Sequence, residues 1–373
     1  MPSGAGSHWG RLQNSAPISS GMDVKGRATA FKVVDVLGFS GMVDYEEMFK
    51  QAGVEVELVK NFCSLEATED EIIAAVGDAD AVITQTTFQP FSRRALASLS
   101  NCKFVISVGI GYDKLDVDAA TELGILVANV PDYCLEEVSD HTMGLILACT
   151  RRIVQLNGIA KRGEWKAQPD PYLGSEVWPK MSRLRGQTLG LVGLGWIAQA
   201  LVLKAKGFRL RVIGYDPHID PSIFREFGVE QVDLDQLLTQ SDVVSLHVPL
   251  TYETTHLLGL EQLKKMKPTA CLINTARGAV VDHDALYIAL THGYISAAAV
   301  DVTEPEPIPL DSPLLKLDNF IVTAHSASAS PLSFAELPPR PAEEVIRVIK
   351  GEWPIGLLNP QVKEKYRRKW AQA

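Results

Sequence analysis

Long apolar runs, paired cysteines and an excess of positive charge are all missing from this sequence. No stretch of its 373 residues approaches the roughly 20 consecutive apolar residues of a membrane-spanning helix, so we expect no membrane partner. The five cysteines are scattered, odd in number and without C-x-x-C spacing, which predicts reduced core residues in a cytoplasmic protein and no metal site. The net charge of −9 offers no attraction to nucleic acid.

What the chain does contain is the composition of a globular protein with room for two cores. Hydrophobic residues make up 46% and charged residues 22% of the sequence, and the length allows two domains. The Gly- and Ser-rich residues 1–28 show no periodicity, and we expect them to be disordered.

From Phe31 onward, short apolar runs alternate with helical patterns, which is typical of parallel sheets covered by helices on both faces. The first predicted strands are Phe31–Leu37, Val54–Val59, Ala81–Thr84, Phe104–Val108 and Ile125–Ala128. The later ones are Leu189–Val192, Arg211–Tyr215, Val243–His247, Ala270–Asn274, Ala297–Val302 and Phe320–Ala324.

The stretch from Thr188 to Asp216 predicts a dinucleotide-binding unit. An apolar run leads into Gly193-x-Gly195-x-x-Ala198, a helical pattern follows, and a second apolar run ends at Asp216, 23 residues beyond Gly193. The first glycine permits a tight turn, the second lets a pyrophosphate approach the backbone, and the helix offers its free N–H groups to the phosphates. A carboxylate at Asp216 can bind ribose hydroxyls and would repel the 2′-phosphate of NADP, so the sequence predicts NAD.

Polar residues follow the later strands, where a parallel sheet presents its carboxyl ends at one edge. Reduction of a 2-keto acid needs an arginine to grip the carboxylate, a histidine to supply a proton, and a carboxylate beside that histidine to favour its charged form. Arg277 follows a buried strand and precedes Gly278, which favours it as the arginine. Spacing does not separate two candidate histidines, His247 and His325, or two candidate glutamates, Glu304 and Glu306.

The segment from Leu135 to Ile159 predicts one long helix with more apolar surface than a single neighbour can cover. We therefore expect this helix to lie at the twofold interface of a homodimer.

From about Phe31 to Pro360 the chain resembles the D-isomer-specific 2-hydroxyacid dehydrogenases. The matching blocks are Gly109–Asp116, Asn129–Pro131, Gly190–Gln199, Tyr215–Pro217, His247–Leu250, Ile273–Gly278, Asp301–Pro307 and Thr323–His325. The resemblance implies two doubly wound α/β domains with parallel sheets. A flavodoxin-like substrate domain would comprise residues 29–130 and 325–373, and an inserted Rossmann NAD domain would comprise residues 131–324.

The resemblance also implies roles for individual residues. Catalysis would be carried by Arg277, Glu306 and His325, with Glu304 as a bystander. Backbone groups around Ile110 and Gly111 would join Arg277 in holding the substrate carboxylate. The cofactor would be bound by Gly193, Gly195, Trp196, Ile197, Asp216, His247, Val248, Pro249, Thr275, Ala276 and Asp301, the last of these at the nicotinamide carboxamide.

The implied activity is that of an NAD-dependent oxidoreductase of CH–OH groups, a D-2-hydroxyacid dehydrogenase working as a reductase of a small 2-keto acid. Within the family the chain looks most similar to the C-terminal-binding proteins, so the alternative is an NAD(H)-sensing, corepressor-like interaction protein. Three positions depart from the patterns: Trp196 replaces the usual Arg or Lys, Ala324 replaces a proline, and Ser326–Ser330 lacks the aromatic residue of the corepressor branch. Gln85 and Thr86 stand where phosphoglycerate-specific relatives carry an Arg-Ser pair, which disfavours phosphoglycerate.

Overall fold

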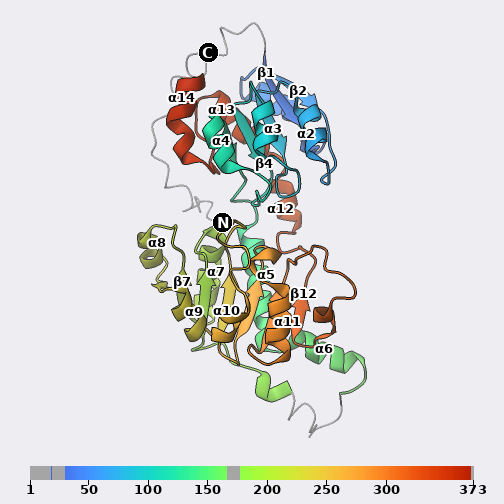
Figure 1. Cartoon of the computed structure of the whole chain (residues 1–373), viewed down its shortest axis with the longest axis vertical. Helices are drawn as coiled ribbons and strands as arrows, with labels where there is room; N and C mark the ends of the chain where they lie inside the picture. The colour runs from blue at the N-terminus through green and yellow to red at the C-terminus, as the bar shows by residue number, and fades with distance from the viewer. Residues whose placement is uncertain (1–17, 19–29, 166–176, 371–373) are drawn as a thin grey trace, which may run out of the picture. The chain divides into compact units, whose positions relative to one another are not determined.

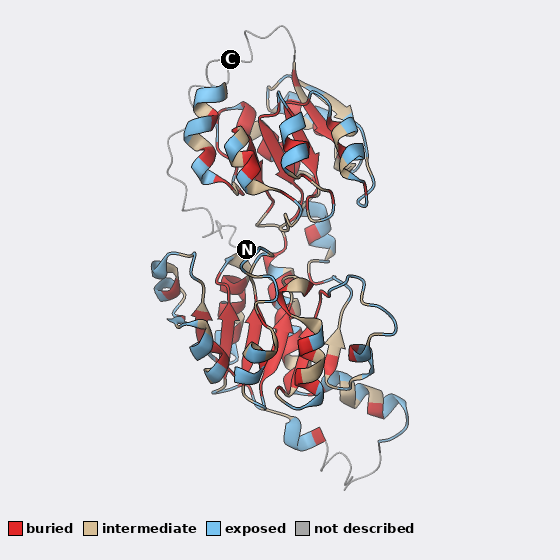
Figure 2. Cartoon of the chain, viewed as in Figure 1, coloured by how far each residue is buried: buried red, intermediate tan, exposed pale blue. Residues whose placement is uncertain are grey.

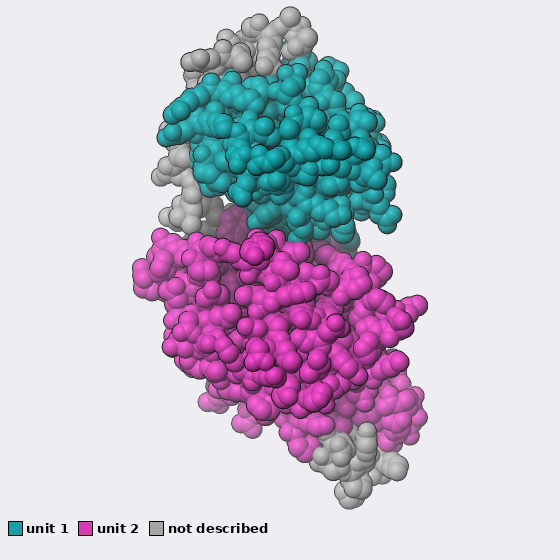
Figure 3. Space-filling view, in the orientation of Figure 1, with its two compact units in different colours: residues 1–133, 331–373 teal, residues 134–330 magenta. Residues whose placement is uncertain are grey.

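A computed structural model describes residue 18, residues 30–165 and residues 177–370 (Figure 1). The segment 1–28, expected to be disordered, lies outside the described residues apart from Ile18. The chain divides into two compact units, which we call unit 1 (residues 1–133 and 331–373) and unit 2 (residues 134–330) (Figure 3). The chain thus crosses between the units after residues 133 and 330. The domain bounds expected from the sequence put these crossings after residues 130 and 324.

Unit 1 is built on a five-stranded parallel sheet with the order β2-β1-β3-β4-β5, which is the flavodoxin-like arrangement that the family resemblance implies. Its strands are β1 (Phe31–Asp35), β2 (Val56–Lys60), β3 (Ala81–Thr84), β4 (Phe104–Ser107) and β5 (Leu126–Ala128). Its helices are α1 (Tyr45–Gln51), α2 (Glu69–Val76), α3 (Arg93–Ser98), α4 (Val117–Leu123), α12 (Pro331–Glu336), α13 (Arg340–Ile349) and α14 (Lys363–Trp370). The apolar strands β3, β4 and β5 are buried along their whole length (Figure 2).

Unit 2 is built on a seven-stranded parallel sheet with the order β12-β11-β10-β9-β6-β7-β8. Its strands are β6 (Thr188–Val192), β7 (Arg211–Tyr215), β8 (Glu230–Gln231), β9 (Val243–Leu246), β10 (Cys271–Asn274), β11 (Ala297–Val300) and β12 (Phe320–Val322). Its helices are α5 (Leu135–Thr150), α6 (Ile153–Lys161), α7 (Trp196–Gly207), α8 (Pro221–Glu226), α9 (Leu234–Gln240), α10 (Leu260–Lys265) and α11 (His283–Thr291). The strand order reverses between β6 and β9, so this is the Rossmann arrangement, whose ligand crevice opens at the reversal. The predicted fold class is confirmed in both units.

The predicted helix from Leu135 to Ile159 is two helices, α5 and α6. Arg152, between them, has a φ of 53°, and a residue in this left-handed conformation cannot continue a right-handed helix. Most apolar side chains of α5, among them Met143, Leu145 and Ile146, are buried within unit 2, where α5 packs on α7, β10 and β11. Exposed apolar surface lies instead on α6, where Ile153 and Val154 are 52% and 51% exposed. The homodimer stays a prediction.

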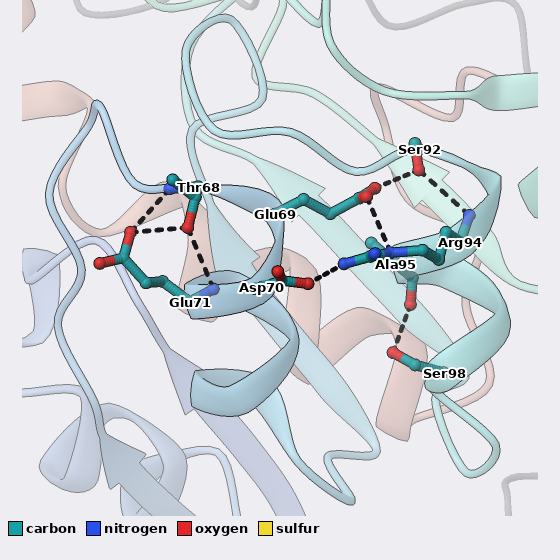
Figure 4. Close-up of polar contacts among 8 residues, drawn as sticks. All are labelled: Thr68, Glu69, Asp70, Glu71, Ser92, Arg94, Ala95 and Ser98. Carbon is teal, nitrogen blue, oxygen red and sulfur yellow. Dashed lines mark hydrogen bonds and ion pairs between the residues drawn. The ribbon is translucent and has the colours of Figure 1, made fainter.

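A polar cluster fixes the start of α2 and joins this helix to α3 (Figure 4). The Glu71 carboxylate accepts the Thr68 N–H at 2.8 Å, while the Thr68 hydroxyl accepts the Glu71 N–H at 3.4 Å. Arg94 on α3 pairs with Glu69 at 3.0 Å and also contacts Asp70. Because water screens exposed ion pairs, this cluster orients the two helices more than it stabilises them.

No helix in the described ranges is both long and apolar enough to span a bilayer. Within the same ranges, no group of three or more His, Cys, Asp or Glu side chains is placed to bind a metal ion. None of the five cysteines forms a disulfide, and four of them are buried.

Candidate active site

The predicted site residues of unit 2 all lie at one edge of its sheet, because parallel strands end at the same edge. They follow β6 (Gly193, Gly195, Trp196, Ile197), β7 (Asp216), β9 (His247, Val248, Pro249), β10 (Thr275, Ala276, Arg277), β11 (Asp301, Glu306) and β12 (His325). Ile110 and Gly111 follow β4, in unit 1.

The turn after β6 has the geometry that a dinucleotide needs. Gly193 has a φ of 90°, and a Cβ atom there would lie 2.6 Å from the carbonyl oxygen of His247, so only glycine fits. A Cβ atom on Gly195, the residue before α7, would meet nothing within 4 Å. Among the described residues, the backbone N–H groups of Trp196 and Ile197 in the first turn of α7 have no partner. Open space beside free N–H groups at a helix N-terminus is what a phosphate group requires.

Asp216 lies directly beside this turn. One carboxylate oxygen accepts the N–H of Leu194 at 2.9 Å, and the other accepts the N–H of His218 at 3.0 Å. Each oxygen keeps a further lone pair, so the carboxylate can still accept two ribose hydroxyls. No arginine follows Asp216, since the next residues are Pro217 and His218.

The structure separates the two candidate histidines by their surroundings. Burial lowers the pKa of His247 to about 4, and its Nε2 lies 2.8 Å from the Ser245 hydroxyl. His247 is therefore neutral at pH 7 and does not carry the proton that a general acid must give. The His325 side chain is 36% exposed, and its Nδ1 lies 2.5 Å from a carboxylate oxygen of Glu306.

Glu306 is held ionised beside His325. Burial raises the pKa of its carboxyl, but the hydrogen bond and charge of His325 act in the opposite direction, helped by the Thr303 N–H at 3.4 Å and the charge of Arg277. The net effect is a lowered pKa. A carboxylate on Nδ1 fixes the orientation of the His325 ring and leaves Nε2 as the nitrogen that can face a substrate.

Glu304 has different partners from Glu306, although only one residue separates them. Its carboxylate lies 2.8 Å from Nε2 of His256, and its backbone N–H donates to Nδ1 of His283 at 3.3 Å. The carboxylates of the two glutamates thus contact different histidines, and of the two only Glu306 contacts His325.

The loop that carries Arg277 is shaped by Asn274, a residue to which the sequence reasoning gave no role. The Asn274 side chain accepts the Ala276 N–H at 3.0 Å and donates to the Arg277 carbonyl at 2.8 Å. A Cβ atom on Gly278 would lie 2.1 Å from the Thr303 carbonyl, so this loop packs against the segment that leads to Glu306. An asparagine at a strand end that bonds the backbone two residues on is a known turn former, and this signal could have found it.

Asp301 organises the turn that carries His325. Its carboxylate accepts the N–H groups of Ser326 and Ala327 at 3.0 and 2.9 Å and the Thr323 hydroxyl at 2.5 Å. Its backbone carbonyl accepts the N–H of His325, whose φ is 48°. The predicted contact of Asp301 with the nicotinamide carboxamide stays a prediction, but the buried carboxylate already has this second use.

In unit 1, the loop after β4 offers two free N–H groups. Gly109 has a φ of 107°, and the carbonyls of Ile110 and Gly111 accept bonds from Asn129 at 2.7 Å and Ser107 at 3.1 Å. The N–H groups of Ile110 and Gly111 have no partner among the residues that the structure describes. Their role in holding a substrate carboxylate stays a prediction.

Known proteins share this architecture. A sequence model described as "D-isomer specific 2-hydroxyacid dehydrogenase, NAD binding domain" matches residues 143–327. A glyoxylate reductase from Korarchaeum cryptofilum is 42% identical over 293 residues, which cover 78% of this chain and 86% of that protein. A D-3-phosphoglycerate dehydrogenase from Methanocaldococcus jannaschii is 40% identical over 293 residues, but these are only 54% of its length.

Solved structures extend the likeness to both units. A protein from Pyrococcus horikoshii OT3 is 28% identical with a TM-score of 0.81, over 90% of this chain and 97% of that one. A D-lactate dehydrogenase from Aquifex aeolicus, complexed with NAD and lactic acid, is 27% identical with a TM-score of 0.68, over 86% and 96% of the two chains.

Proposed function

Since this chain belongs to the D-isomer specific 2-hydroxyacid dehydrogenase family, we propose that it reduces a small 2-keto acid of the glyoxylate class, with NADH rather than NADPH as its partner. It is an NAD-dependent oxidoreductase of CH–OH groups. The observation that carries the proposal is the 2.5 Å contact between His325 and Glu306, beside the charge of Arg277.

The choice of NADH rests on Asp216. The open glycine turn supports a role in binding a pyrophosphate, and the Asp216 carboxylate, which accepts the N–H of Leu194 in that turn, supports a role in binding the adjoining ribose. Its negative charge disfavours a 2′-phosphate, and no arginine stands beside it to compensate. When bound, the cofactor supplies or receives the hydride.

Three side chains perform the remaining chemistry. The Arg277 guanidinium binds the substrate carboxylate through two parallel hydrogen bonds, which fixes the orientation of the keto group. His325 gives its Nε2 proton to the keto oxygen as the alcohol forms, and takes the proton back in the reverse direction. Glu306 stabilises the charged ring and sets its tautomer through Nδ1.

A small substrate is supported by the relatives, one of which is a glyoxylate reductase that is 42% identical. Phosphoglycerate is disfavoured, because Gln85 and Thr86 replace the expected Arg-Ser pair and cannot pair with a phosphate as arginine does.

Initial rates with NADH across glyoxylate, hydroxypyruvate, pyruvate and larger keto acids test the proposal. We expect the smallest acids to be reduced fastest, His325→Gln to lose most of the turnover, and the matched variant His247→Gln to alter mainly the affinity for NADH. Tight NADH binding without turnover on any keto acid would refute the reductase and favour an NAD(H)-sensing interaction protein.

A further inference from the structure

A second candidate binding site lies in unit 2, away from the strand ends that carry the residues described above. It is a hollow of about 400 Å³ between the end of α5, the segment that leads into β6, and the end of α7. Four arginines line it: Arg151, Arg183, Arg185 and Arg209. These residues precede β6 or β7 or follow α5, so they lie toward the amino ends of the strands, at the edge opposite Gly193 and Asp216.

The four arginines place positively charged side chains around one hollow. Among the described residues, no carboxylate lines the hollow and none forms an ion pair with any of the four arginines. Within the described part of the chain, Arg151 donates a side-chain hydrogen bond to the carbonyl oxygen of Ser182 at 3.2 Å. In a chain of net charge −9, four guanidinium groups around one hollow create a local positive field that attracts an anion.

Backbone hydrogen bonds hold the wall of the hollow in place. The Ser182 N–H donates to the Thr150 carbonyl at 2.9 Å, and the Gly186 N–H donates to the Arg209 carbonyl at 3.1 Å. These bonds fix the segment that carries Arg183 and Arg185 between the ends of α5 and α7. The backbone positions of these arginines are therefore set by the fold, and their side chains are exposed to solvent.

The rest of the lining is apolar. Leu184 is 6% exposed, Leu147 is half-buried, and Phe208 is 42% exposed. Arginines recognise phosphate oxygens in pairs of hydrogen bonds, and an exposed aromatic ring offers a face on which a planar group can stack. A volume of this size is within the range of small-molecule sites.

We propose that this hollow binds a nucleoside di- or triphosphate, with the phosphates on the arginines and the base against Phe208. The site is separate from the glycine turn after β6, and the proposal does not depend on which keto acid the enzyme reduces.

The test is calorimetric titration of ATP into the full chain with the NADH site saturated beforehand, at about 50 and 200 mM salt. We expect one saturable site that weakens at the higher salt. The double variant Arg183→Gln/Arg185→Gln should bind ATP about ten-fold or more weakly than the parent, because two charged partners of the phosphates are lost. Arg225→Gln, an exposed arginine on α8 of the same unit, is the matched control and should leave the affinity unchanged.

Phe208→Ala separates base from phosphate recognition. It should weaken ATP several-fold but leave the affinity for inorganic triphosphate unchanged, and adenosine alone should not bind. The proposal is overturned if ATP does not bind to the NADH-saturated protein, or if the double variant binds it as tightly as the parent. The proposal is also overturned if the double variant differs from the parent only in its mass measured by sedimentation and not in its affinity for ATP. In that case the hollow would belong to an interface between copies of this chain. Unchanged thermal unfolding and NADH affinity of each variant show that the fold is intact.

Discussion

Replacing Glu306 with glutamine should slow keto-acid reduction on the alkaline side of its pH profile and leave the fold intact. Glutamine keeps the shape and can still accept a hydrogen bond from His325, but it removes the charge that favours the protonated ring. Reduction requires the protonated ring, so the limb along which the rate falls with rising pH should move to lower pH. The pKa of Glu306 is lowered, so in the parent enzyme its carboxylate stays ionised throughout an assay range of about pH 5 to 9.

The size of the effect follows from the exposure of the pair. The two side chains are 36% and 37% exposed, so solvent screens their attraction, and a discounted value of about 1 kcal/mol is at the upper end for such pairs. That energy corresponds to a fall of about five-fold in kcat/KM on the alkaline limb, with little change on the acid plateau.

Glu304→Gln is a control that the chain itself provides. Glu304 contacts His256 at 2.8 Å, and the two side chains are 45% and 49% exposed, so this pair is close in type to the first but does not reach His325. The assay is the pH profile of reductive kcat/KM for both variants and the parent, together with thermal unfolding. A limb that shifts with Glu304→Gln, or stays in place with Glu306→Gln, would show that the proton relay is assigned to the wrong carboxylate.

Three further outcomes are expected. Asp216→Ala should weaken NADH binding by roughly 1–3 kcal/mol, because hydrogen bonds to the ribose are lost. It should also reduce the difference in affinity between NADH and NADPH in a fluorescence titration, and equal affinities of the parent enzyme for both would contradict this role. Arg277→Lys keeps the charge but loses the two-pronged geometry, so kcat/KM for the keto acid should fall severely while NADH affinity changes little; near-parental kinetics would place the carboxylate elsewhere. Burial raises the pKa of Glu344 on α13 to about 7, so the folded state retains a proton that the unfolded chain releases, and stability falls as pH rises toward that value. Glu344→Gln should therefore raise the unfolding free energy, and the gain over the parent should be about 1–3 kcal/mol larger at about pH 8.5 than at about pH 5. Denaturant unfolding at both pH values measures this difference, and an equal gain at the two would contradict it.

The sequence predicts the edge of the unit 2 sheet well, because two simple rules act there together. Parallel strands end at one edge, and a polar residue after a buried apolar run has nowhere else to lie. Gly193, Asp216, Arg277 and His325 could all be placed at that edge from these rules alone.

The choice between Glu304 and Glu306 could not be made from the residues themselves, since both precede a proline and differ in position by only two residues. The partner of each depends on the path of the loop after β11, which is set by contacts with distant segments such as the close approach of Gly278 to Thr303. The additional use of Asp301 was missed for the same reason, because its hydrogen-bond partners follow a different strand.

The break between α5 and α6 was missed because Arg152 carries no local signal for a left-handed conformation. No helix or strand was predicted between Asp216 and Val243, where α8, β8 and α9 lie. A capping signal was present there: Asp233 and Gln236 form a reciprocal pair at the start of α9, with the Gln236 N–H bonded to Asp233 at 2.7 Å.

The division of unit 1 into two chain segments has a consequence for the order of folding during synthesis. One apolar core of unit 1 joins Phe104 and Ile106 of β4 to Val345 and Val348 of α13 and to Tyr366 of α14. All seven strands of unit 2 are synthesised after β4 and before α13 and α14. Unit 2 can therefore complete its sheet while the face of β4 that packs on α13 and α14 is still exposed. A chain that ends at residue 330 should accordingly yield a protease-resistant unit 2 and a cleaved segment 30–133. Translation from the N-terminus thus completes the inserted nucleotide-binding unit first and the unit that begins the chain last.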